Sequence, residues 1–438
     1  MPTSELKSGL LASLLADDSF RPEEPKSLED TQLSPTLIEG LVLKLYLNVG
    51  SMSGRKTAEH ICLPMGILDP IMQSMRTRQL IMHTGSAPLN DYYYTLTDQG
   101  RNRAQSYMAS SAYVGPAPVA LDDYITSVEA QSIRNEAPQE ADLIAAFEGL
   151  SVDADMFDRL GPAVNSGAGL FLYGAPGNGK TTLAKRITAC YGQSIWVPRT
   201  IVEDGQFIKL FDAAFHETVE EGASSILKSA DHDRRWIKIC RPTVVVGGEL
   251  TMDALEIRHD QHSNICEASL QMKSNCGTLL IDDFGRQRMQ PSELLNRWIV
   301  PLESRVDYLA LPNGKKIQVP FEQLIIFSTN LEPADLTDDA FLRRITYKIE
   351  VGDSNQEEFH TLFKIFARQF DCEYDKAAVD HLIQKHYLPT NRPLRRCQPR
   401  DLLSQIRNYC VYKGLPTEMR ADYFDRVVSS YFTVVAGD

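Results

Sequence analysis

A glycine-rich stretch of eight residues, Gly174–Thr181, constrains the fold of this chain more than any other feature. Its sequence, GAPGNGKT, follows the apolar run 169–173 and precedes the helix-like run 182–187. Strand, loop and helix in this order are the context that the pattern G-x-x-x-x-G-K-[ST] requires. The glycines let the backbone curl so that N–H groups point at phosphate oxygens, and the helix N-terminus adds positive potential. The stretch predicts a phosphate-binding loop for a nucleoside triphosphate; a glycine-rich turn with a surface lysine is the alternative.

The side chains of this loop have separate expected roles. Lys180 is expected to reach the β- and γ-phosphates, and the Thr181 hydroxyl is expected to ligate Mg²⁺. ATP and Mg²⁺ are therefore the expected cofactors. The predicted cofactor-binding residues are Gly174, Ala175, Pro176, Gly177, Asn178, Gly179, Lys180, Thr181 and Thr182.

A second apolar run, 278–281, ends in two acidic residues, Asp282 and Asp283. This Walker B pattern predicts a buried strand that carries carboxylates to the C-terminal edge of a parallel sheet, where such sheets bind ligands. We expect Asp282 to hold Mg²⁺ together with Thr181, and Asp283 to polarise the water that attacks the γ-phosphate. The alternative is an acidic turn after a buried strand.

Two further polar positions follow strand-like and helix-like runs. The run 323–329 ends at Asn330, whose amide can hydrogen-bond both the γ-phosphate and the attacking water. The helix-like segment 338–345 contains Arg343 and Arg344. An arginine there fits a finger that stabilises transition-state charge in the site of a neighbouring subunit. A solvent-facing or intrasubunit pair is the alternative for these arginines.

The C-terminal segment, 353–438, is expected to be helical, and Pro399 precedes a helix whose first turn carries Arg400. The order of phosphate loop, Walker B strand, strand-end asparagine, arginine pair and helical segment resembles the bacterial-type AAA+ ATPases over residues 136–438. The Walker B run is similar to that of initiator and helicase-loader ATPases, and the run 398–407 is similar to the lid helix of the Holliday-junction branch-migration motor.

This resemblance implies an α/β fold, with a P-loop NTPase core (a parallel sheet flanked by helices) and a C-terminal helical lid. It also implies roles for single residues, with Asn330 as sensor 1, Arg343 or Arg344 as the arginine finger and Arg400 as sensor 2. The expected catalytic residues are Asp283, Asn330, Arg343, Arg344 and Arg400, and the expected metal ligands are Thr181 and Asp282.

The sequence departs from the family pattern in two places. The second acid of the Walker B run is Asp283, where glutamate is commoner, and its side chain is one methylene shorter. After a predicted strand at 194–197, an insertion is expected at about 200–275, with an added strand or hairpin near 244–246. The insertion carries His232, His259 and His262, for which no cysteine or carboxylate spacing completes a metal site.

Residues 36–112 predict three short helices, a β-hairpin and a closing helix. This order, with the run LTDQGR at 96–101, resembles a winged-helix domain of the α+β class. The resemblance puts the helix with Arg76 and Arg78 in the position that reads DNA. The alternative is a winged helix that contacts protein, which the sparse basic residues favour.

The remaining segments and the composition bound the possible partners. Residues 1–35 predict a mobile acidic tail with a candidate amphipathic helix at 6–15, and 113–135 predict a linker that starts proline-rich. A net charge of −13 argues against a general nucleic-acid coat. No apolar run approaches the roughly 18 residues of a membrane span. The N-terminus lacks a signal-peptide pattern, and the eight cysteines include no C-x-x-C pair, so we expect a cytoplasmic protein.

After the N-terminal segments, these features predict an ATPase core at 136–352 and a lid domain at 353–438. We expect an ATPase that acts as a homo-oligomeric ring and remodels or assembles a macromolecular partner. One alternative is a DNA-associated motor or loader that places residues 36–112 on duplex DNA. A second alternative, which follows from Asp283, is an ATP-binding switch with slow turnover.

Overall fold

The computed structural model describes residues 20–150, 152, 154–192, 194–219, 232–336 and 342–432. The candidate helix at 6–15 lies outside these residues, and so does the first half of the helix-like segment expected at 338–345. The chain forms two compact units, each assembled from separate stretches of sequence. The first unit contains residues 1–137, 191–279 and 288–325, and the second contains 138–190, 280–287 and 326–438.

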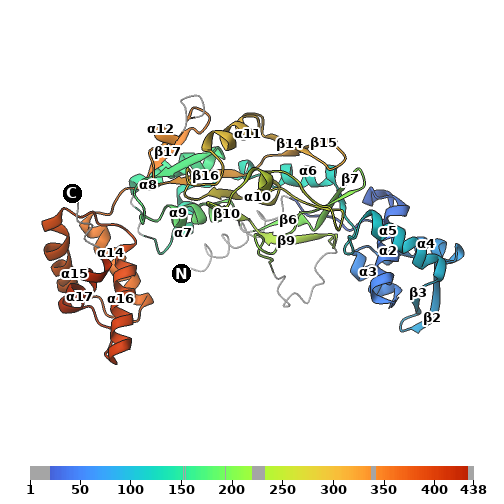
Figure 1. The fold of residues 1–438 in the computed structure, drawn as a ribbon, viewed down its shortest axis with the longest axis horizontal. Helices are drawn as coiled ribbons and strands as arrows, with labels where there is room; N and C mark the ends of the chain where they lie inside the picture. Colours follow the sequence, from blue (N-terminus) through green and yellow to red (C-terminus); the bar gives the residue numbers. More distant parts are fainter. Residues whose placement is uncertain are drawn as a thin grey trace, which may run out of the picture. The chain divides into compact units, whose positions relative to one another are not determined.

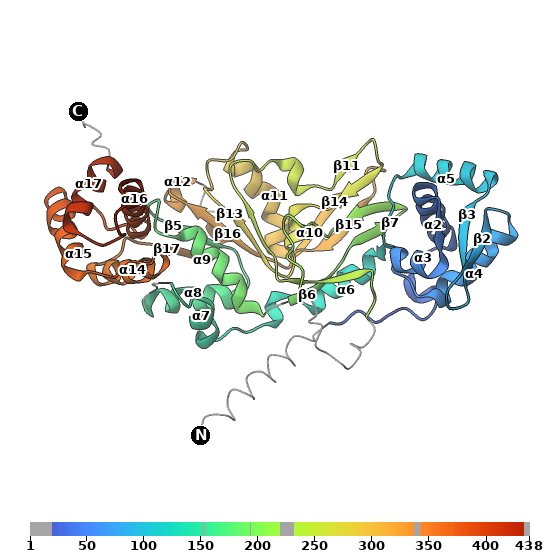
Figure 2. The same cartoon turned by 90° about the horizontal axis from the view of Figure 1, so that it is seen from below.

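The strand before the glycine-rich loop, β5 (Leu170–Tyr173), has a parallel neighbour on each side. These neighbours are β16 (Leu324–Thr329) and β17 (Tyr347–Glu350), and Leu170 lies opposite Ile326 and Tyr347 in the register. The three strands lie side by side in Figure 2. Parallel strands end at the same edge, so the residues that follow β5 and β16 come together there.

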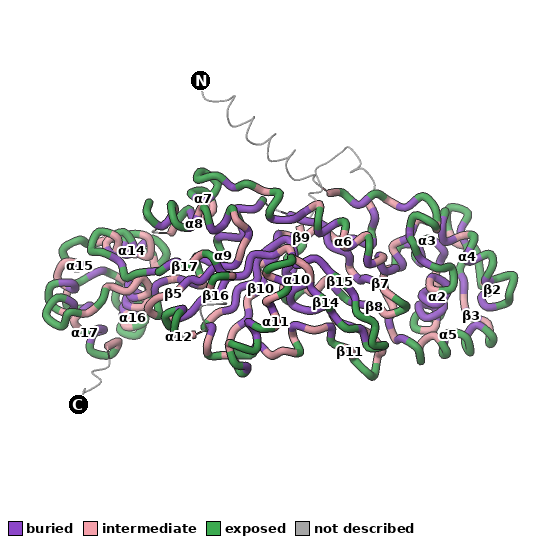
Figure 3. The backbone as a smooth tube through the Cα atoms, turned by 90° about the horizontal axis from the view of Figure 1, so that it is seen from above, coloured by how far each residue is buried: buried purple, intermediate pink, exposed green. Residues whose placement is uncertain are grey.

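The complete sheet has the order β10-β13-β16-β5-β17, where β10 spans Thr243–Val246 and β13 spans Thr278–Ile281. Every residue of β13 and β16 is buried, and Figure 3 shows the buried colour at β16. Continuous apolar runs of this kind are typical of parallel strands that are covered on both faces. β16 lies between β5, which precedes the glycine-rich loop, and β13, which precedes the acidic pair. Asn330 therefore follows the middle one of these three strands.

The second unit contains helices that come before and after the strands of this sheet in sequence, and one of them begins at the glycine-rich loop. α9 (Lys180–Ile187) begins directly after the glycine-rich loop, and Gly179, in the left-handed conformation, is its N-cap. Before β16 in sequence come α7 (Glu140–Ala146), α8 (Ala154–Ser166) and the 3₁₀ turn η3 (Thr188–Tyr191). After β16 comes α12 (Pro333–Leu336).

The C-terminal bundle, residues 356–431, has its own apolar core, in which Phe359, Phe363 and Phe424 are fully buried. The bundle is drawn in orange and red in Figure 1. A capping box between Asn355 and Glu358 starts its first helix. Its elements are α14 (Gln356–Gln369), α15 (Lys376–Leu382), the π-helical turn η5 (Ile383–Tyr387), the 3₁₀ turn η6 (Leu388–Thr390), α16 (Gln398–Lys413) and α17 (Ala421–Tyr431).

The N-terminal part of the first unit has the helices and hairpin that its sequence predicts. A three-stranded sheet of order β1-β3-β2 packs with four helices, and the Thr97 hydroxyl caps the last helix by accepting from the Gly100 N–H. Its elements are η1 (Glu29–Thr31), α2 (Pro35–Val49), β1 (Ser51–Ser53), α3 (Gly54–Ile61), α4 (Met65–Thr77), β2 (Ile81–Ala87), β3 (Asp91–Leu96) and α5 (Asp98–Ser110).

The rest of the first unit is rich in strands. A five-stranded sheet has the order β11-β12-β8-β7-β4, and β14-β15 and β6-β9 form two-stranded sheets. The elements are β4 (Val119–Ala120), α6 (Leu121–Ala130), η2 (Ile133–Asn135), β6 (Ser194–Pro198), β7 (Thr200–Glu203), β8 (Gln206–Lys209), β9 (Trp236–Cys240), η4 (Met252–Leu255), β11 (Arg258–Asp260), β12 (Ile265–Glu267), α10 (Leu270–Ser274), α11 (Pro291–Ser304), β14 (Val306–Ala310) and β15 (Lys316–Pro320).

Two strands have neighbours that the sequence pattern did not reveal. The strand predicted at 194–197 forms as β6, but it pairs antiparallel with β9, outside the sheet of the glycine-rich loop. β10, which was expected within an insertion, is instead the edge strand beside β13. Strand pairing depends on distant partners, and a local pattern of apolar residues does not identify them.

The parallel sheet, the glycine-rich loop and the flanking helices confirm the predicted α/β class with a P-loop core. None of the described helices combines the length and the apolar run that a membrane crossing would need.

Candidate nucleotide-binding site

Two glycines of the loop have backbone conformations and surroundings that exclude a side chain. Gly174 has φ +130° and Gly177 has φ +88°, in the region that L residues rarely adopt. A Cβ at Gly174 would lie 2.7 Å from the Val351 carbonyl oxygen, and a Cβ at Gly177 would lie 2.5 Å from Cys397 Sγ. The loop is therefore held closely between the chain after β17 and the start of α16.

The Lys180 ammonium group lies inside the curve of this loop. Its Nζ donates to the carbonyl oxygens of Gly174 (2.9 Å) and Ala175 (3.1 Å), and to Asn330 Oδ1 (2.7 Å). Burial lowers the pKa of Lys180, while the negative charges of Asp282 and Asp283 act in the opposite direction. The Lys180 side chain therefore lies among three oxygen acceptors, at the place where phosphate oxygens are expected.

The acidic pair lies within reach of the same loop. Thr181 Oγ1 donates a hydrogen bond of 2.8 Å to Asp282 Oδ2, and Asn330 Nδ2 donates one of 3.1 Å to Asp283 Oδ1. Asp283 has φ +49°, and its backbone N–H points to Asp282 Oδ1 at 3.2 Å. A hydroxyl and a carboxylate oxygen are the kind of donors that Mg²⁺ binds, so Thr181 and Asp282 fit the predicted metal ligands.

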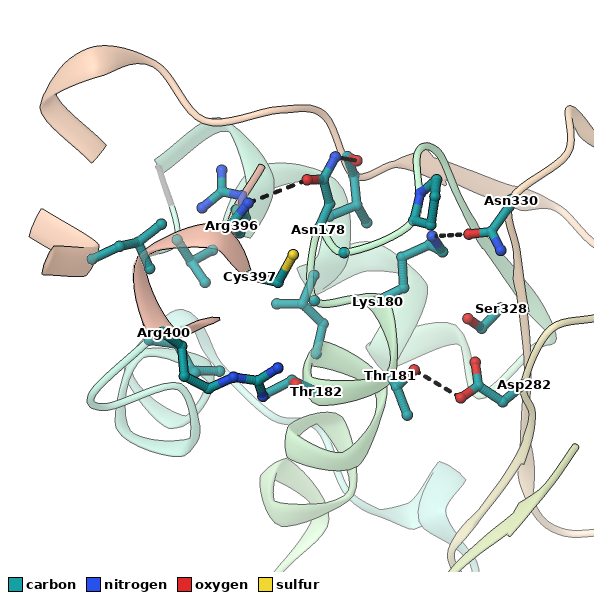
Figure 4. Close-up of a pocket in the computed structure, with 18 of the residues that line it drawn as sticks. Asn178, Lys180, Thr181, Thr182, Asp282, Ser328, Asn330, Arg396, Cys397 and Arg400 are labelled. Atoms are coloured by element: carbon teal, nitrogen blue, oxygen red, sulfur yellow. Dashed lines mark hydrogen bonds between the residues drawn. The ribbon is translucent and has the colours of Figure 1, made fainter. Parts of the chain in front are cut away.

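These residues line one pocket with a volume of about 530 Å³. Figure 4 shows Lys180, Thr181, Asp282 and Asn330 converging on one side of it, and Arg396 and Arg400 on the other. Apolar side chains also line it, namely Leu150, Val152, Met156, Leu183, Val351, Leu362 and Phe366. A pocket with an apolar part and a few converging polar groups is the usual form of a small-molecule site.

The segment before α16 attaches the C-terminal bundle to the glycine-rich loop. Cys397 N–H donates to the Gly177 carbonyl (2.8 Å), and the Arg395 guanidinium donates to the Pro176 carbonyl (2.7 Å). Asn178 Nδ2 donates to Asp353 Oδ1 (2.9 Å), and its Oδ1 accepts from the Arg396 N–H (3.4 Å). Nucleotide in the pocket would therefore touch both the loop and the bundle.

The three predicted arginines have different positions. Arg400 lines the pocket, but its guanidinium is largely exposed and bonds Asp401 Oδ1 at 2.9 Å. Arg343 and Arg344 are not among the described residues that line the pocket; Arg343 is exposed and Arg344 is half-buried. The remaining predicted site residues, apart from the loop positions Gly174 and Ala175, all line it.

Several residues that line the pocket were not predicted from the sequence. Ser328 lines the pocket from β16, two positions before Asn330, and so lies on the same side of the strand; this spacing could have indicated it. Arg396 forms an ion pair with Glu358 (2.9 Å) at the opposite wall, and Cys397 lies beside it. No local pattern marks these two residues, because only the packing of α16 brings them to the loop.

Comparisons with known proteins give one family match and a set of similar structures. Residues 355–430 match a family described as a domain of unknown function (DUF8689). A search among curated protein sequences finds no match to this chain. Among solved structures, the chain is similar to NtrX from Brucella abortus in complex with ATP, at 13% identity and a TM-score of 0.40, covering 66% of this chain and 56% of that one.

It is also similar to the Holliday junction branch migration motor RuvB from Thermotoga maritima, at 15% identity and a TM-score of 0.35. That likeness covers 63% of this chain and 67% of the other. The chain thus spans little more than half the length of the NtrX chain. The chain's own strand order and loop geometry define its fold.

Proposed function

We propose that this chain is an ATPase of the AAA+ type that binds ATP with Mg²⁺ and hydrolyses it to ADP and phosphate. The observation that carries the proposal is the convergence of Lys180 and Thr181, from the glycine-rich loop, with Asp282 and Asn330 in one pocket. A lysine, a hydroxyl, a carboxylate and an amide at one sheet edge are the set that phosphoryl transfer to water uses.

Each residue has a role that follows from its position. Lys180 exchanges its bonds to loop carbonyls for bonds to the β- and γ-phosphates. Thr181 Oγ1 and Asp282 Oδ2, now 2.8 Å apart, provide oxygen ligands for Mg²⁺, which neutralises phosphate charge when bound. Asp283 orients and polarises the attacking water, and Asn330, which bonds both Lys180 and Asp283, positions that water against the γ-phosphate.

Arginines would complete the transition-state site. Arg400, as sensor 2, would turn from Asp401 to the γ-phosphate and so link nucleotide state to the C-terminal bundle. Arg343 or Arg344 would act on the pocket of an adjacent subunit, which requires a homo-oligomeric ring. Arginine suits both tasks because its planar guanidinium binds phosphate oxygens in pairs.

We propose a protein partner that the ring remodels or assembles. The supporting observation lies in residues 35–110: Arg78, one of the two basic residues expected to read DNA, forms an ion pair with the buried Glu39. The DNA-associated alternative predicts salt-dependent binding of duplex DNA by the full chain. A cytoplasmic location accords with the eight cysteines, which are all free.

Steady-state hydrolysis and equilibrium binding of ATP test the proposed activity. Lys180→Ala should abolish both, whereas Asp283→Asn should retain ATP binding and lose turnover. Lys185→Ala is the matched control, because Lys185 is an exposed lysine of the same helix, α9. ATP binding without turnover in the parent chain, even with Mg²⁺, would favour the slow switch; ATP binding that survives Lys180→Ala would contradict the proposed site.

A further inference from the structure

Two histidines and an aspartate meet on the C-terminal bundle, at a place that no nucleotide motif accounts for. His381 lies on α15, His386 lies on η5 and Asp425 lies on α17. Asp425 Oδ1 is 2.5 Å from His386 Nε2 and 3.1 Å from His381 Nε2. One ligand atom from each of the three side chains lies within 4.8 Å of the others, and all three side chains are half-buried.

The π-helical turn is what places both imidazoles on one side. The two histidines are five residues apart, and five residues of α-helix turn about 140° past a full circle. A π-helix bonds residue i to residue i+5, so positions with this spacing lie nearly above one another. η5 spans Ile383–Tyr387, between the two histidines and including the second. Such turns are rare in proteins, and those that do occur are often found at functional sites.

We propose that His381, His386 and Asp425 bind a divalent transition-metal ion, with zinc as the best fit. Two imidazole nitrogens and one carboxylate oxygen are a known ligand set for tetrahedral zinc, with a fourth position left for water or another donor. With ligand bonds of about 2.0–2.1 Å, neighbouring ligand atoms of a tetrahedron lie about 3.3 Å apart. The observed contacts of 2.5 and 3.1 Å are close to this spacing, so small rotations of the side chains open the site.

The surroundings of Asp425 leave one of its oxygens for the metal. Lys385 Nζ donates to Oδ2 at 2.7 Å, while both histidines face Oδ1. The hydrogen bond from Lys385 is the chief cause that holds the pKa of the Asp425 carboxyl far below its usual range, and the bonds from His386 and His381 add to it. Oδ1 is therefore the oxygen that both imidazoles share, and it is the one that would bind the metal.

The competing explanation is a hub of ion pairs, in which His381, His386 and Lys385 attach Asp425 and hence α17 to η5. The two explanations differ for Lys385→Ala. Lys385 is a half-exposed cation beside the site, so its removal takes positive charge away from a metal ion and should preserve or tighten metal binding. A hub without a metal would lose an ion pair and gain no affinity for zinc.

Calorimetric titration of zinc into the untagged, chelator-stripped full chain tests the proposal, with metal content measured after desalting. We expect one zinc ion per chain and a rise in melting temperature, independent of nucleotide. His386→Gln and Asp425→Asn should each weaken zinc binding at least tenfold, because each removes one of the three proposed ligand atoms. Lys385→Ala should bind zinc at least as tightly as the parent chain.

Two control variants separate this site from other places where zinc could bind. His259 and His262 are a second pair of histidines close in sequence, in the first unit, and the double variant with glutamine at both positions should bind zinc as the parent does. Asp282→Asn, which removes a proposed Mg²⁺ ligand, should also leave zinc binding unchanged. Circular dichroism identifies any variant that fails to fold.

The absorption spectrum of bound Co²⁺ gives a second measurement that does not depend on stability. The parent chain and the Lys385→Ala variant should show the intense visible band of a tetrahedral ion, and the two ligand variants should lose it. Less than stoichiometric zinc in the parent chain, or parent-like zinc binding by folded His386→Gln and Asp425→Asn proteins, would overturn the proposal.

Discussion

Lys180 Nζ donates a hydrogen bond of 2.7 Å to Asn330 Oδ1, and so joins the glycine-rich loop to the end of β16. The same amide donates through Nδ2 to Asp283. Asn330 is therefore in contact with both the lysine of the loop and the second carboxylate of the acidic pair. This contact exists because β16 lies between β5 and β13 in the sheet.

Asn330→Ala should lower the turnover of ATP by about 100-fold, the usual cost of one lost side-chain donor at a reacting group. ATP affinity should change little, because Lys180 and the loop backbone remain. Steady-state hydrolysis and equilibrium ATP binding measure the two effects. Asn313→Ala, in the exposed turn between β14 and β15, is the control. Unchanged turnover, or loss of ATP affinity as large as in Lys180→Ala, would contradict the role of Asn330.

Gly177→Ala should lower the free energy of unfolding by about 1–3 kcal/mol and weaken ATP binding. The new Cβ would lie 2.5 Å from Cys397 Sγ, at a φ of +88° that alanine rarely adopts. Thermal and denaturant unfolding measure the loss. The double variant with Cys397→Ala should regain part of it, since the steric contact is relieved while the backbone strain remains.

Gly66→Ala provides the matched control for this substitution. Gly66 lies in α4, and a Cβ there meets nothing within 4 Å. Alanine in a helix should stabilise the protein by about 0.5–1 kcal/mol relative to glycine. Equal destabilisation by the two substitutions would show that close packing at Gly177 is not the cause.

Lys44 should make the stability of the protein rise with pH in the alkaline range. Burial lowers its pKa from 10.5 to about 8, and its Nζ donates to the Ser111 carbonyl at 3.0 Å. Below pH 8 both folded and unfolded states carry the proton, so the full cost of burying the charge is present. Between pH 8 and 10.5 the unfolded state binds more protons than the folded state, so the free energy of unfolding increases with pH.

The predicted gain is at most about 3 kcal/mol. Denaturant unfolding of the parent chain and of Lys44→Met, at several pH values, measures it as a difference between the two proteins. The methionine variant should lack this alkaline increase. Parallel pH profiles for the two proteins would show that the pKa of Lys44 is not lowered by folding.

Arg78→Ala should lower the free energy of unfolding by about 1–3 kcal/mol, because it removes a charged partner of Glu39, a carboxylate that is only 5% exposed. Arg103 Nε, 3.4 Å from Glu39, compensates in part. Arg76→Ala is the control: Arg76 Nη1 lies 3.2 Å from His83 Nε2 in a solvent-exposed contact, so the substitution should change stability by less than about 0.5 kcal/mol. Unchanged stability with lost duplex binding in Arg78→Ala would favour the DNA-associated alternative.

Elements whose signals lie within a few residues could be predicted from the sequence. The glycine-rich loop with its strand and helix, the strand before Asp282, and the hairpin and capped helix ending at Ser110 all formed where expected. In each case a cap, a turn or an apolar run specifies the local backbone by itself, as the Thr97 side chain does for α5.

Positions that depend on distant packing could not be predicted in this way. The 194–197 strand formed but pairs with β9, and β10 took the edge beside β13. Arg396 and Cys397 reach the loop only because the segment before α16 packs against it. The cluster of His381, His386 and Asp425 needs a π-helical turn and a partner helix far along the chain, as the 39-residue separation of His386 and Asp425 illustrates.

The sequence by itself determined which chemical groups this protein places at the proposed nucleotide site: a loop of N–H donors, Lys180, Thr181 and two carboxylates. Only the tertiary structure decided that Asn330 stands between them and that the C-terminal bundle forms the opposite wall of the pocket. The physical reason is the distance along the chain over which the deciding interactions act. Loop geometry and caps depend on bonds between neighbours in sequence, whereas strand order and helix packing depend on apolar surfaces that meet only in the folded chain.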